Sequence, residues 1–99
     1  MNKTISVKET KEKTDAELID VRTIEEFNEE HIKNSTNIPL NLIPNFIDNI
    51  SKINREIILI CRSDNRAKMA QNFLEKNNIN SKVMIGGIIE WQKQNYPLE

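Results

Sequence analysis

The sequence predicts an α/β domain with a mainly parallel central sheet of about five short strands and helices on both faces. Short apolar runs alternate along the whole chain with segments whose apolar residues recur at helical spacing. The run at residues 56–60 is almost continuously apolar, as is typical of a strand buried on both faces of a parallel sheet. With 99 residues, the chain has the size of one domain, which we expect to span residues 1–99.

Each predicted strand is a short apolar or alternating run that contains β-branched residues. The runs are residues 4–7, 16–21, 36–38, 56–60 and 82–85. The first alternates polar and apolar residues, which indicates a half-exposed strand. The third ends at Pro39, which cannot donate to a strand ladder, and the last ends at Gly86 and Gly87.

The predicted helices lie between the strands and show caps or apolar stripes at helical spacing. They cover residues 24–30, 40–50, 66–77 and 88–94, and the charged residues 9–14 form a short helix or a loop. Thr23 and Glu26 have the spacing of a capping box at the start of the first of these. Pro44 fits the second only near its first turn, and Asn77 with Asn78 ends the third.

Composition excludes several classes of function. The net charge is −1 without a basic block, so we expect no nucleic-acid partner. No apolar run approaches the ~20 residues of a membrane span, and the N-terminus does not lead into a signal-type apolar region. A single cysteine cannot form an internal disulfide, which agrees with a reducing compartment. We therefore expect a cytoplasmic protein, and a monomer.

The only cysteine, Cys61, lies where the buried strand 56–60 ends. Ligands of open parallel sheets bind beyond the carboxyl ends of the strands. The N–H groups at the start of the next helix, with Arg62 and Arg66, favour a thiolate there. A cysteine ending a strand is often only a small hydrophobe. That alternative fits poorly with the polar run that follows, Arg62, Ser63, Asp64, Asn65 and Arg66, and we interpret Cys61 as a nucleophile.

Four segments, in order and spacing, give a resemblance to a known family. The loop Cys-Arg-Ser-Asp-Asn-Arg at 61–66 resembles the Cys-Arg-x-Gly-x-Arg loop of single-domain rhodaneses, a family of sulfurtransferases. The family's other motifs are matched by LIDVRTIEEFNEEHI at 18–32, STNIPL at 35–40 and GGIIEW at 86–91. Any one of these matches is weak, whereas the four together are strong.

The resemblance implies a sulfurtransferase that takes a sulfane sulfur from thiosulfate, or a related small anionic donor, as a Cys61 persulfide. The N–H groups of residues 62–66 would hold the persulfide, and a thiol or cyanide would accept the sulfur. Arg62 and Arg66 would bind the donor, and no metal or organic cofactor is implied. The six-residue loop has the sulfurtransferase length, one residue shorter than in related phosphatases. The alternatives are a persulfide carrier in a protein relay and a non-catalytic interaction domain.

Asp64 departs from the family, whose loop has glycine at this position. If the carboxylate points into the loop, it weakens anion binding, and if it points to solvent its effect is small. Asp also tolerates the positive φ that a converging loop can require. On these grounds we expect Asp64→Gly to increase thiosulfate activity.

Three further residues come from the segment 18–32. Asp20 and Arg22 flank Val21 and share one face of a strand. The resemblance places both residues near the pocket, with Asp20 supporting the structure and Arg22 contacting the substrate. An equally weighted alternative is that the two residues form only a weak ion pair on the surface. His31, the only histidine, we interpret as structural rather than as a base or metal ligand. The resemblance implies that it orders the segment before Asn37.

Overall fold

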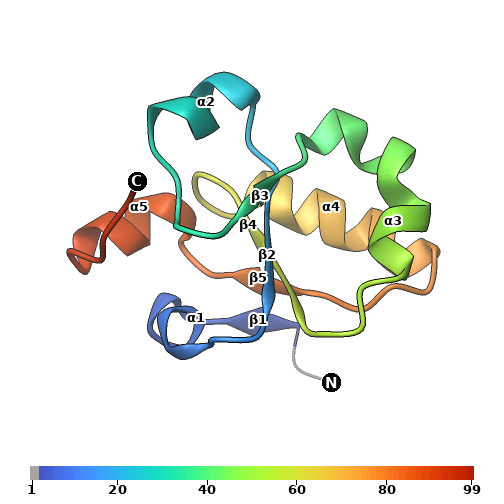
Figure 1. Cartoon of the computed structure of the whole chain (residues 1–99), viewed down its shortest axis with the longest axis horizontal. Helices are drawn as coiled ribbons and strands as arrows, with labels where there is room; N and C mark the ends of the chain where they lie inside the picture. The colour runs from blue at the N-terminus through green and yellow to red at the C-terminus, as the bar shows by residue number, and fades with distance from the viewer. Residues whose placement is uncertain (1–2) are drawn as a thin grey trace.

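All five strands run parallel in a single sheet of order β1-β5-β4-β2-β3, in a computed structural model that describes residues 3–99 (Figure 1). The strands are β1 (Thr4–Ile5), β2 (Glu17–Asp20), β3 (Thr36–Asn37), β4 (Ile57–Ile60) and β5 (Lys82–Met84). The predicted α/β class and parallel sheet are confirmed. Because the strands are parallel, their carboxyl ends share one edge, where the cysteine lies.

Helices cover both faces of the sheet, with α3 and α4 on one side and α1 and α5 on the other (Figure 1). The helical segments are α1 (Val7–Glu12), α2 (Ile24–Glu29), the 3₁₀ segment η1 (Leu40–Phe46), α3 (Ile47–Ser51), α4 (Asn65–Lys76) and α5 (Gly87–Lys93). Among residues 3–99, no helix has the length and apolar character needed to cross a membrane.

The central strand β4 separates two apolar layers. Ile57 and Leu59 pack with η1, α3 and α4, whereas Ile58 and Ile60 pack with α1 and α5. All four side chains are buried. This alternation explains the continuous apolar run, because successive side chains of a strand enter opposite faces, and both are covered.

Two element predictions were wrong in part. The strand expected at 4–7 stops at Ile5, because Ser6 and Glu9 form a capping box that starts α1. The helix expected at 40–50 is divided into η1 and α3, with Pro44 inside the 3₁₀ part. Pro44 has no N–H to donate, so it cannot take its place in an α-helical hydrogen-bond ladder.

Candidate active site

Cys61 directly follows β4 at the carboxyl edge of the sheet. Its side chain is buried, with 1% of the residue exposed, and it packs within the apolar layer on the α4 side. Three residues then lead into α4, which begins at Asn65 and runs for 12 residues. The cysteine therefore lies at the end of the most buried strand and at the start of a tight strand-to-helix loop, as the sequence predicts.

The start of α5 holds the first two carbonyl groups of this loop. The Ile88 N–H donates to the Cys61 carbonyl at 2.9 Å, and the Ile89 N–H donates to the Arg62 carbonyl at 3.1 Å. Both oxygens thus point toward α5. A loop whose carbonyl oxygens are engaged in this way presents less negative charge to an incoming anion.

Gly87 makes this contact possible because it touches the loop backbone. A Cβ atom there would lie 2.4 Å from the Cys61 carbonyl oxygen and 2.6 Å from the carbonyl carbon and oxygen of Arg62. Its φ is also +58°, a conformation that side chains other than glycine rarely adopt. The sequence showed Gly86 and Gly87 as a strand break and as part of a motif, but not as the surface on which the cysteine loop rests.

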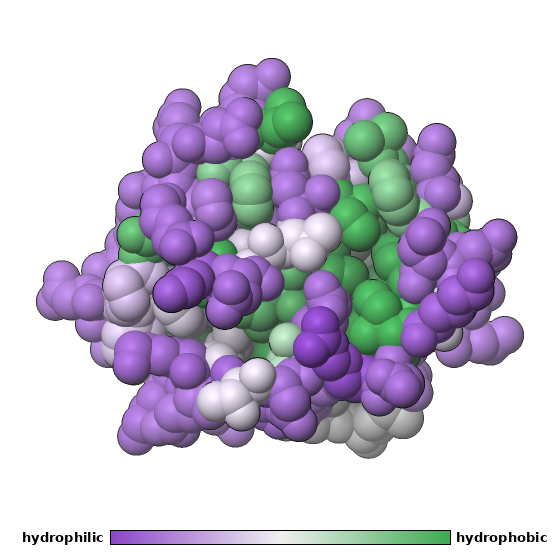
Figure 2. Space-filling view, viewed as in Figure 1, coloured by the Kyte–Doolittle hydropathy of each residue, from purple (hydrophilic) through white to green (hydrophobic). Residues whose placement is uncertain are grey.

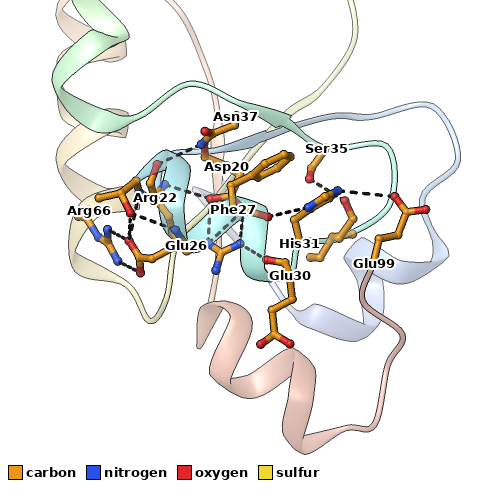
Figure 3. A network of polar contacts seen from close by, with 12 residues as sticks. Asp20, Arg22, Glu26, Phe27, Glu30, His31, Ser35, Asn37, Arg66 and Glu99 are labelled. Atoms are coloured by element: carbon orange, nitrogen blue, oxygen red, sulfur yellow. Dashed lines mark hydrogen bonds and ion pairs between the residues drawn. The ribbon is translucent and has the colours of Figure 1, made fainter.

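The arginines of the loop have different surroundings. Arg66 forms a two-bonded ion pair with Glu26 of α2, Nη1 to Oε1 at 2.6 Å and Nη2 to Oε2 at 3.0 Å (Figure 3). Glu26 also completes the predicted capping box with Thr23. The Arg62 side chain is exposed and enters none of the hydrogen bonds or ion pairs found within residues 3–99. Arg62 is thus the loop cation free to meet an anion.

Arg66 and the two Thr23 donors lower the pKa of Glu26 from its usual 4.5 to about 2. In return, the Glu26 carboxylate raises the pKa of Arg66, and the nearby Cys61 and Asp20 add to this effect. Both groups of the pair are therefore ionised at neutral pH. The Glu26–Arg66 pair thus connects α2 to the start of α4, directly after the cysteine loop.

Asp20 and Arg22 form a second ion pair, which is buried. Arg22 Nη2 lies 2.8 Å from an Asp20 oxygen and also donates to the Glu30 carbonyl at 2.8 Å (Figure 3). Asn37 Nδ2 holds the carbonyls of Asp20 and Arg22, at 3.0 Å each. The alternative of a surface ion pair is wrong, because Asp20 is 0% and Arg22 4% exposed. The segment that carries α2 and β3 covers the end of β2.

Arg22 also borders a small hollow of about 210 Å³ between α2 and α5, which it shares with Arg62. Its predicted role as a substrate contact thus stays a prediction. Among the described residues, no three His, Cys, Asp or Glu side chains are grouped so as to hold a metal ion.

The whole arrangement matches a known family. The rhodanese-like domain model matches residues 5–94. The chain belongs to the rhodanese family. It is 30% identical over 92 residues to the "Putative sulfur carrier protein YrkF" of Bacillus subtilis, covering 88% of this chain but only 49% of that protein.

Two other comparisons agree. A sulfurtransferase of Allochromatium vinosum is 31% identical over 85 residues, which are 85% of this chain and 78% of that protein. The crystal structure of a rhodanese-related protein from Thermoplasma volcanium superposes with a TM-score of 0.91 at 26% identity, covering 98% of this chain and 97% of the other. The family assignment therefore holds for both sequence and fold.

The Asp64 side chain of this rhodanese takes neither of the two expected directions. Its Oδ1 accepts the Gly86 N–H at 2.8 Å, so the carboxylate bonds to the glycine turn before α5. Its φ is −134°, and the expectation of a possible positive φ at this position is wrong. Ser63 and Asn65, the other predicted loop residues, are exposed.

The surroundings of His31 favour the structural interpretation. Its ring stacks on Phe27 with centroids 3.9 Å apart, and Nδ1 lies 2.8 Å from the Phe27 carbonyl oxygen. That oxygen only accepts, so Nδ1 carries the proton. Nε2 lies 3.6 Å from a carboxylate oxygen of Glu99, and the backbones of His31 and Glu99 exchange two hydrogen bonds. His31 thus joins α2 to the C-terminal segment.

We expect Gly87→Ala to lower the free energy of unfolding by about 2–5 kcal/mol. Two costs add up: alanine would have to adopt a left-handed backbone conformation, and its Cβ would clash with the loop backbone. Urea unfolding measures this loss. Asn95→Ala is the matched control, because Asn95 has a φ of 59° but is exposed. It should cost about 1 kcal/mol. Equal losses in the two variants would show that the close approach to Cys61 and Arg62 is unimportant.

The Glu26–Arg66 pair should make the free energy of unfolding depend on pH in the acidic range. Because the folded pKa of Glu26 lies below its usual value, the pair stabilises the fold above about pH 4.5, and this contribution disappears as pH falls toward 2. Both side chains are about 30% exposed, so we expect about 1–2 kcal/mol after solvent screening.

Glu26→Gln tests this dependence, because glutamine keeps the cap on Thr23 and removes the charge. Urea unfolding should show the variant less stable than the wild type at pH 7 and nearly equal to it near pH 2. The same difference at both pH values would contradict the assignment.

Proposed function

We propose that this rhodanese is a sulfurtransferase in which the Cys61 thiolate accepts a sulfane sulfur. The thiolate attacks the outer sulfur of thiosulfate, the S–S bond breaks, and sulfite leaves with the bonding electron pair. A thiolate or cyanide then attacks the outer sulfur of the Cys61 persulfide, and the Cys61 thiolate returns. The observation that carries the proposal is the six-residue loop after β4, with its first two carbonyls held by α5.

The arginines around the loop differ in whether a carboxylate already pairs with them, and this difference decides which of them binds the donor. Arg66 is committed to Glu26 and Arg22 to Asp20, whereas the Arg62 guanidinium is exposed. We therefore assign electrostatic capture of the anionic donor chiefly to Arg62. Loop N–H groups would hold the persulfide sulfur, as anions are held at the starts of helices. A single domain acting as a monomer in the reducing cytoplasm is part of the proposal.

A persulfide carrier that passes sulfur to another protein is the second candidate. One observation favours it: large apolar side chains are exposed on α2 and η1, the two elements that border Arg66. Ile24 on α2 is 55% exposed, and Leu42 and Phe46 on η1 are 40% and 39% exposed. Figure 2 shows hydrophobic surface over both elements. Between them lies a hollow of about 300 Å³ that includes Arg66. A small inorganic donor needs no such surface, whereas a protein partner would bury it.

Mass spectrometry of the intact protein after incubation with thiosulfate tests the chemistry. We expect a gain of one sulfur atom that dithiothreitol removes, since persulfides are reversible. Cys61→Ser should fold and gain nothing, because the hydroxyl is far less acidic. Sulfur transfer by Cys61→Ser at the wild-type rate would overturn the mechanism. A full persulfide yield with very slow release to cyanide would favour the carrier over the thiosulfate enzyme.

Steady-state kinetics with thiosulfate separate the two arginines. Arg62→Ala should raise the apparent KM by about 10- to 150-fold, the loss of one charge-assisted contact. The double variant Glu26→Gln/Arg66→Ala, which removes the whole ion pair and leaves no unpaired carboxylate, is compared directly with the wild type. It should raise KM much less than Arg62→Ala does. A larger KM effect at position 66 would show that Arg66 leaves Glu26 to bind the donor.

A further inference from the structure

We propose that Asp64 is a positioning residue, whose carboxylate clamps the Gly86–Gly87 turn and thereby fixes the cysteine loop. The inference rests on the proposed function of Cys61 for its kinetic part. It starts from the hydrogen bond between Asp64 Oδ1 and the Gly86 N–H, 2.8 Å long, which joins residues that are 22 positions apart. The two partners belong to two different motifs of the family, and the contact exists only because glycine is absent at position 64.

The backbone at Asp64 makes no use of what glycine offers. Its φ of −134° and ψ of −30° lie outside the left-handed region, so glycine gains nothing there. The side chain also does not cap α4, although Asp64 is the residue directly before that helix. Its observed contribution is therefore the oxygen that binds Gly86. Hydrogen bonds to an ionised acceptor are stronger than those between neutral groups.

The turn that Asp64 holds is the same turn that carries the loop. Gly87 touches the backbone of Cys61 and Arg62, and the N–H groups of Ile88 and Ile89 bind their carbonyls. The loop is thus bound to the start of α5 at its beginning through Cys61 and Arg62, and at its end through Asp64. Releasing the end would let residues 62–64 move relative to the thiol.

This geometry predicts the opposite of what the charge of Asp64 suggests. If the carboxylate only repelled the donor, Asp64→Gly and Asp64→Asn would both be faster than the wild type. If it is a clamp, Asp64→Asn keeps an acceptor oxygen of the same shape and stays within about threefold of the wild type. Asp64→Gly and Asp64→Ala lose the acceptor and should form persulfide about 10-fold more slowly, the effect of one lost hydrogen bond.

The chain offers a direct view of the clamp, because it has only two glycines and only Gly86 follows an isoleucine. Labelling with ¹⁵N-glycine and ¹³C-carbonyl isoleucine therefore identifies the Gly86 amide by NMR without a full assignment. Its hydrogen exchange should be slow in the wild type and in Asp64→Asn. Exchange should be at least about 10-fold faster in Asp64→Ala. Unprotected exchange of Gly86 in the wild type would overturn the clamp.

The rate of persulfide formation at Cys61, followed by mass spectrometry under single-turnover conditions, supplies the second readout. Asp48→Ala is the control for charge, since Asp48 is exposed on α3, outside the loop. It should leave both readouts unchanged. Fast Gly86 exchange with a wild-type rate in Asp64→Ala would refute a positioning role. If the wild type forms no persulfide at all, the proposed function fails, and Gly86 exchange still decides whether the clamp exists.

Discussion

The contact between the start of α5 and the cysteine loop is the constraint on which the site depends. Gly87 lies so close to the backbone of Cys61 and Arg62 that no Cβ fits between them, and the next two N–H groups bind the carbonyls of those residues. Backbone N–H groups of α5 thus hold backbone carbonyl groups of the cysteine loop, and this contact does not depend on the rotamer of any side chain. The position of Cys61 is therefore set first by contacts between backbone groups, to which the Asp64 side chain adds its hydrogen bond to Gly86.

A buried ion pair, rather than backbone contacts, organises the segment between β2 and α2 beside the site. Asp20 and Arg22 are buried together, and Asn37 and the Glu30 carbonyl satisfy the polar groups that remain near them. A buried pair of this kind is costly to break, because the partner left behind is an uncompensated charge in the interior. The Asp20–Arg22 pair therefore specifies where the chain turns between β2 and α2. Because Glu26 lies on α2 and binds Arg66, the same turn also positions the Arg66 side chain.

Local sequence patterns predicted the parts of this structure that depend on neighbours in the chain. Thr23 and Glu26 form the expected capping box, and the all-apolar β4 is buried on both faces. Ser6 and Glu9 carry the same capping signature, which the alternation of residues 4–7 concealed. The burial of Asp20 and Arg22 depends on coverage by later segments, and the Asp64–Gly86 bond joins two distant loops. No spacing rule within one segment contains that information.

The order of the strands has a consequence for the timing of folding on the ribosome. β4 and the cysteine are made well before β5, yet β5 must enter the sheet between β4 and β1. Until residues 82–89 have emerged and docked, nothing from α5 can hold the carbonyls of Cys61 and Arg62. The nascent chain therefore carries a thiol without its finished cradle. The loop backbone at Cys61 and Arg62 gains its contacts with α5 only when nearly the whole domain has been synthesised, which couples the geometry of this loop to completion of the fold.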